Sequence, residues 1–127
     1  MTEPEFTRAL RDLIDHHLGS IDEIEVLLAV FARRGEPMSA ASVATAAQKS
    51  VPLASEHLQA LAGRGFLVHH ESENAYSYPL RAAEVDQAIE QLSRMYHQRP
   101  VTLIKALYDR PSTAVLSFAD AFRLRRD

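Results

Sequence analysis

The side chains with the clearest potential for chemistry are histidines, four of which stand as adjacent pairs, His16-His17 and His69-His70. Imidazole nitrogens bind Zn²⁺, so such pairs suggest a metal site. Adjacent side chains diverge by about 100° on a helix and point to opposite faces on a strand. Neither pair has the i, i+4 spacing of a helical zinc site. We therefore expect no metal site, and we place His69 and His70 in a solvated turn.

The motifs of common enzyme classes are missing from the sequence. It contains no cysteine, which excludes a thiolate zinc site, a cysteine nucleophile and a disulfide framework. It also lacks the glycine motifs of serine hydrolases, phosphate-binding loops and dinucleotide-binding folds. We therefore expect a protein that is not an enzyme and that uses no cofactor.

The elements that must position the remaining polar residues follow from the spacing of apolar residues. Ser20, with Glu23 three residues later, is typical of the start of a helix. The predicted helices are 6–18, 21–34, a short one opened by Ser39, and 52–63 with Pro52 at its first position. Residues 66–68 and 75–78 are expected to form a β-hairpin around a turn at 69–74.

A second group of helices is expected after the hairpin. Residues 82–97 carry an apolar stripe, and Arg99-Pro100 should end that helix. Two shorter helices, 101–108 and 113–124, follow in the prediction. The chain is expected to be one domain, 1–127, with a core at 20–80 and flanking helices in 1–19 and 81–127.

The helix and the hairpin meet in a local signature, L-x-x-L-x-x-x-G-F-L, formed by Leu58, Leu61, Gly65, Phe66 and Leu67. The leucines pack their helix onto the first helix of the unit, and glycine allows the chain to leave the helix with a positive φ. In these features the chain resembles the winged helix-turn-helix regulators of bacteria, including the MarR-like group. The resemblance implies a mostly α fold with a small β-hairpin wing and additional terminal helices.

A less specific resemblance covers the rest of the chain. It is to small bacterial proteins in which a winged helix precedes a tail, and which we associate with transcription regulation. The matching residues here are Tyr96, Arg99-Pro100-Val101 and Phe118-Ala119-Asp120-Ala121-Phe122-Arg123.

The resemblance implies a way of binding double-stranded DNA. In winged-helix regulators the second helix of the turn enters the major groove, and the wing contacts the neighbouring backbone or minor groove. Helix 52–63 would then be the recognition helix, with outward residues Ala54, Ser55, Glu56, His57 and Gln59. The implied base contacts are Ser55, His57 and Gln59, and the implied phosphate contacts are Lys49, Arg64 and Arg81.

The charge of helix 52–63 and of the expected wing departs from the usual pattern of DNA-binding winged helices. Phosphate neutralisation supplies most of the affinity of non-specific DNA binding. Helix 52–63 contains no lysine or arginine, Glu56 would face the duplex, and Glu71 and Glu73 occupy the expected wing tip. Two functions therefore stay open: a DNA-binding transcriptional regulator, or an adaptor whose winged helix binds another protein, with the C-terminal tail as a possible docking segment.

The terminal helices carry more apolar surface than one winged domain needs to cover itself, and exposed stripes usually mark interfaces. We expect a homodimer built from the N-terminal and C-terminal helices. The alternative is an intramolecular bundle in which the last two helices fold back on the domain. The acidic N-terminus, the missing cysteines and the absence of a long apolar run favour a cytoplasmic location.

Overall fold

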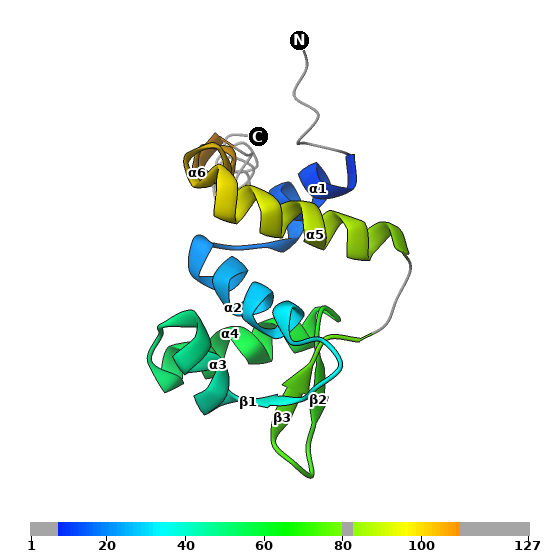
Figure 1. Cartoon of the computed structure of the whole chain (residues 1–127), viewed down its shortest axis with the longest axis vertical. Helices are drawn as coiled ribbons and strands as arrows, with labels where there is room; N and C mark the ends of the chain where they lie inside the picture. The colour runs from blue at the N-terminus through cyan, green and yellow to red at the C-terminus, as the bar shows by residue number, and fades with distance from the viewer. Residues whose placement is uncertain (1–7, 80–82, 110–127) are drawn as a thin grey trace, which may run out of the picture. The chain divides into compact units, whose positions relative to one another are not determined.

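The computed structural model describes residues 8–79 and 83–109, which form a mostly helical, winged-helix-like fold with a small antiparallel sheet (Figure 1). This confirms the expected fold class. The chain divides into two compact units, residues 20–82 and residues 1–19 with 83–127. We call them the winged-helix unit and the flanking unit. The predicted helix 113–124 and the tail segment Phe118-Ala119-Asp120-Ala121-Phe122-Arg123 lie outside the described residues.

The described part of the winged-helix unit contains three helices and a three-stranded sheet with the strand order β1-β3-β2. Tyr76 lies at the centre of this sheet, opposite Met38 on one side and His69 on the other. In chain order the elements are α2 (Ile21–Ala32), β1 (Met38–Ser39), α3 (Ala40–Ala47), α4 (Val51–Gly63), β2 (Val68–His70) and β3 (Ala75–Ser77).

Serine side chains cap the three helices of this unit. The hydroxyl oxygens of Ser20, Ser39 and Ser50 accept hydrogen bonds from backbone N–H groups that would otherwise lack a partner. The donors are, in order, Glu23 at 3.2 Å, Ser42 at 3.1 Å and Leu53 at 3.2 Å. Because Ser50 is the cap, α4 begins at Val51, so Pro52 is its second residue and not its first as predicted.

Helix α2 is the centre of the core. Its contacts within the unit are with α3, α4 and β3. Val26 and Val30 are fully buried together with Ile24 and Leu27, so burial extends around more than one face of the helix. Burial stabilises the fold by about 1.5–3 kcal/mol for each such side chain. The signature residues Leu58, Leu61, Phe66 and Leu67 are buried as expected.

Gly65 ends α4 in the predicted way. Its φ is +87°, a left-handed conformation that strains residues with a Cβ. The N–H of Phe66 donates to the Leu61 carbonyl at 2.9 Å, and the N–H of Gly65 donates to the Ala62 carbonyl at 3.1 Å. These two bonds form a Schellman motif, which turns the chain back toward the sheet.

The hairpin differs from the prediction in two respects. His69 and His70 lie in β2 and not in the turn, which spans residues 71–74. The residues predicted to begin the strand, Phe66 and Leu67, are buried but precede β2. Strand β1 was not predicted, because two residues show no periodicity and become a strand only by pairing with β3.

The described part of the flanking unit consists of helices. Instead of the single helix predicted from residue 6 to 18, a short α-helix leads into a π-helical turn, where the Leu18 N–H donates to the Leu13 carbonyl at 3.0 Å. The elements are α1 (Arg8–Asp12), η1 (Leu13–His17), α5 (Ala83–Gln98) and α6 (Pro100–Asp109). Helix α5 contacts α1 and α6, and α6 contacts η1.

The apolar stripes of α1, η1 and α5 are buried. Leu10, Ile14, Ile89 and Leu92 have no exposed surface within the single chain. They are therefore core residues and not the exposed seam on which the homodimer prediction was based. No helix among the described residues is long and apolar enough to span a membrane.

The geometry at the end of α4 predicts opposite effects for two neighbouring glycines. Gly65→Ala should destabilise the fold by about 1 kcal/mol through its left-handed φ alone, since an added Cβ would meet no atom within 4 Å. Gly63→Ala, inside the helix and equally free of contacts, should stabilise it by about 0.5–1 kcal/mol. Denaturant unfolding of both variants measures the difference. Equal effects would show that the backbone conformation at Gly65 is not what matters.

Candidate recognition surface

The polar face of α4 contains three of the residues that the sequence placed outward. Glu56 and Gln59 are exposed and Ser55 is half-buried. Gln59 Nε2 donates a hydrogen bond to Ser55 Oγ at 3.2 Å, because residues four apart lie on one side of a helix. This face of the helix is therefore accessible to a partner.

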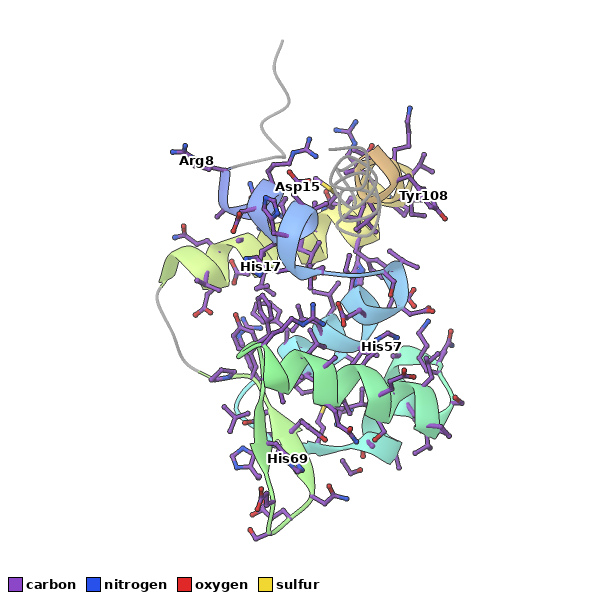
Figure 2. All side chains as sticks on the ribbon, turned by 180° about the vertical axis from the view of Figure 1, so that it is seen from behind. Arg8, Asp15, His17, His57, His69 and Tyr108 are labelled. Atoms are coloured by element: carbon purple, nitrogen blue, oxygen red, sulfur yellow. The ribbon has the colours of Figure 1, made fainter. Side chains whose placement is uncertain are left out.

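Two other residues expected on that face lie elsewhere. Ala54 is fully buried, which corrects the prediction; it precedes Leu58 by four residues and so shares the core side of α4. The His57 side chain is 18% exposed, and its Nδ1 lies 3.7 Å from a Glu23 carboxylate oxygen on α2. Figure 2 shows His57 on the side of α4 that faces α2.

Lys49, at the start of the turn before α4, is held by two carboxylates of α2. Its Nζ lies 2.6 Å from Asp22 Oδ1 and also donates to Glu25, and its side chain is 13% exposed. The hydrogen bond from Lys49 lowers the pKa of Asp22, and the bonds to Asp22 and Glu25 raise the pKa of Lys49. The charge of this lysine is therefore neutralised inside the unit.

Arg64, at the other end of α4, is held by Glu23. Its guanidinium donates to the carboxylate of Glu23, a side chain only 6% exposed, and its Nε donates to the Ala60 carbonyl at 3.3 Å. A buried carboxylate requires such a partner, because burying an unpaired charge is strongly unfavourable. The third implied phosphate contact, Arg81, lies outside the described residues.

A hollow of about 430 Å³ separates α4 from the hairpin. It brings two predicted residues, Ser55 and Gln59, next to hairpin residues that the sequence analysis did not assign to a site. The sequence could have indicated which residues of α4 line the hollow, since positions 55, 59 and 62 lie on one face of the helix. Which hairpin residues line the hollow depends on the strand register. The residues lining the hollow are Ala40, Ser55, Gln59, Ala62, His69, Asn74 and Tyr76.

The hairpin side of the hollow is built around a stacked ring pair. The rings of His69 and Tyr76 lie 4.5 Å apart between centroids with an interplanar angle of 18°. His69 Nε2 lies 3.3 Å from Asn74 Oδ1, and Asn74 has a φ of +50°, which asparagine tolerates better than most residues. The side chain of His70 is not part of this ring pair, and its Nε2 lies 2.7 Å from Ser77 Oγ. Figure 2 shows His69 on the hairpin.

The surface around the hollow is neutral to acidic. Helices α3 and α4 and both strands of the hairpin contain no lysine or arginine, whereas Glu56, Glu71 and Glu73 are exposed. Within residues 8–79 and 83–109, no group of three or more His, Asp or Glu side chains is arranged to hold a metal ion. The side chains present suit hydrogen bonding, stacking and the binding of positive charge.

Comparison of the chain with protein-family models, with curated proteins and with solved structures finds no significant match.

The contacts of Lys49 predict a pH-dependent effect on stability. Lys49→Met should lower the free energy of unfolding by about 1 kcal/mol at neutral pH. The loss should shrink as the pH falls through the lowered pKa of Asp22, because a protonated carboxyl no longer attracts the ammonium. It should also shrink as the pH rises through the raised pKa of Lys49.

The measurement is denaturant unfolding of wild type and variant from about pH 2 to pH 12, because the lowered pKa of Asp22 and the raised pKa of Lys49 lie toward the two ends of that range. Lys105→Met, at an exposed position of α6, is the matched control and should change stability little at any pH. A Lys49→Met effect that stays constant across this range would instead indicate packing of the lysine stem.

Proposed function

We propose that the winged-helix unit is a protein-interaction module whose α4 and hairpin contact a protein partner. The observation that carries this proposal is the pairing of Lys49 and Arg64 with carboxylates of α2. These are the cations that flank the recognition helix. Because both cations are engaged in ion pairs, the described surface of α3, α4 and the hairpin offers no unpaired arginine or lysine to a partner.

This electrostatic balance is unfavourable for DNA. Phosphate contacts supply much of the affinity of DNA-binding proteins, and each contributes a salt dependence of about −0.9 in the log–log slope. Withdrawing Arg64 from Glu23 to reach a phosphate would leave a nearly buried carboxylate without its strongest partner. Such a loss costs on the order of 3 kcal/mol when the pair is fully buried, and less for the partly exposed Arg64.

The second candidate function is a DNA-binding transcriptional regulator. The observation in its favour is that Ser55 and Gln59 lie side by side on the exposed face of α4, next to the hairpin. Glutamine pairs with adenine through two hydrogen bonds in the major groove. In this function the phosphate contacts would come from residues other than Lys49 and Arg64.

Binding to duplex DNA distinguishes the two functions. Fluorescence anisotropy with a labelled duplex of about 30 base pairs should give a dissociation constant weaker than about 100 μM at physiological salt. The matched control is the double variant Glu71→Lys, Glu73→Lys, which adds two cations at the wing tip and should bind DNA measurably. Micromolar binding by the wild type, with a steep salt dependence, would favour the DNA-binding regulator.

We also retain the homodimer as a proposal, with α6 as its contact surface. The support is a stripe of apolar side chains at helical spacing, Val101, Ile104 and Tyr108, which are 68%, 37% and 84% exposed. The N-terminal helix and α5 no longer support it, since their described stripes are buried.

Sedimentation equilibrium should then give about twice the chain mass of 14.2 kDa. Val101→Glu combined with Tyr108→Ser should return the chain to a monomer without unfolding it, because both side chains are exposed. Glu90→Gln, an exposed change on α5, is the control and should leave the association unchanged. A wild-type monomer at concentrations near 100 μM would show that the dimer prediction is wrong.

A further inference from the structure

The hollow between α4 and the hairpin contains two hydrogen-bond acceptors that the protein leaves open. Gln59 uses its Nε2 on Ser55, and nothing among the described residues hydrogen-bonds its Oε1. Tyr76 is only 4% exposed and lines the hollow, yet its hydroxyl has no hydrogen-bond partner in the described chain. Among the described residues, Asp15 Oδ1 is the one fully buried side-chain oxygen or nitrogen without a hydrogen-bond partner, so the Tyr76 hydroxyl remains accessible to solvent and to a ligand. Two accessible acceptors suit a ligand that donates hydrogen bonds.

One wall of the hollow is flat and aromatic. The exposed His69 ring lies parallel to Tyr76 behind it, and the contact with Asn74 Oδ1 helps to hold the ring in that plane. Planar groups stack on such a surface, and the guanidinium of arginine does so more readily than the ammonium of lysine. The aromatic wall therefore favours a planar ligand, in addition to the preference for a hydrogen-bond donor.

The charge around the hollow selects for a cation. Glu56 follows Ser55 on α4, and Glu73 precedes Asn74 at the wing tip, with Glu71 in the same turn. All three carboxylates are exposed, and none has an ion-pair partner within residues 8–79 and 83–109. No aspartate, glutamate, lysine or arginine is among the residues that line the hollow.

We infer that this hollow receives an arginine side chain from a basic segment of a protein partner. The guanidinium is planar, carries five N–H donors and is always charged, which matches the aromatic wall, the two open acceptors and the acidic surroundings. This inference rests on the proposed protein-interaction function and names the chemistry of the partner. A hollow of about 430 Å³ is within the usual size of ligand sites.

The test uses the full chain, isotopically labelled, and short peptides of glycine and serine that contain two arginines. Titration by NMR should shift the amide signals of residues 55, 59, 69 and 74–76 and saturate. Matched peptides replace both arginines by lysine, which keeps the charge, or by citrulline, which keeps the planar shape. Each should bind at least about tenfold more weakly, because the site uses charge and shape together.

Three variants locate the contact. Tyr76→Phe keeps the aromatic ring and removes only the hydroxyl, and Gln59→Leu removes the other acceptor; each should weaken arginine-peptide binding about three- to tenfold. Gln59→Glu places a carboxylate at the same position and should strengthen it. Glu36→Gln, an exposed carboxylate in the loop before β1, is the control and should leave binding unchanged.

Two results would overturn the inference. Equal binding of arginine and lysine peptides, or no shift at residues 59 and 76, would show that the hollow does not recognise guanidinium, while the protein-interaction function would stand. Saturable shifts of the same residues on adding duplex DNA would instead defeat the proposed function and the inference together.

Discussion

Carboxylates at the start of α2 hold the cationic side chains at both ends of α4 and so help to fix how these two helices pack. Asp22 and Glu25 bind Lys49 just before the helix, and Glu23 binds Arg64 just after it. Ion pairs that are partly or wholly buried contribute less to net stability than to one particular packing, since a displaced partner would leave a charge alone. They therefore favour a single orientation of α4 on α2.

The same pairs decide what the outer surface of α4 can do. Holding the helix by its ends leaves the stripe with Ser55 and Gln59 free, and the Schellman turn at Gly65 brings the hairpin beside it. The positive charges of Lys49 and Arg64, which help to position this surface, are paired within the unit and so are not available to bind a partner. The described surface of α4 and the hairpin presents hydrogen-bond acceptors, stacked rings and carboxylates, and these support the proposal of a partner that supplies the positive charge.

Features that depend on near neighbours along the chain could be predicted from the sequence. The caps Ser20 and Ser39, the glycine at the end of α4 and the burial of Leu58, Leu61, Phe66 and Leu67 were predicted, because each depends on residues within a few positions along the chain. The candidate site was predicted only in part. Ser55 and Gln59 were placed correctly on the polar face, since helical periodicity is a local property.

Features that join distant segments became visible only in the folded chain. Lys49 and Arg64 were expected to contact phosphates, but their charges are paired with residues 24 to 41 positions away. Ala54 was expected outward because alanine fits a surface or a core equally well, and β1 exists only through its pairing with β3. The hollow joins α4 to a hairpin whose register places Tyr76 opposite His69. Residue spacing along one helix or strand gives no information about such contacts, because they depend on how separate elements pack.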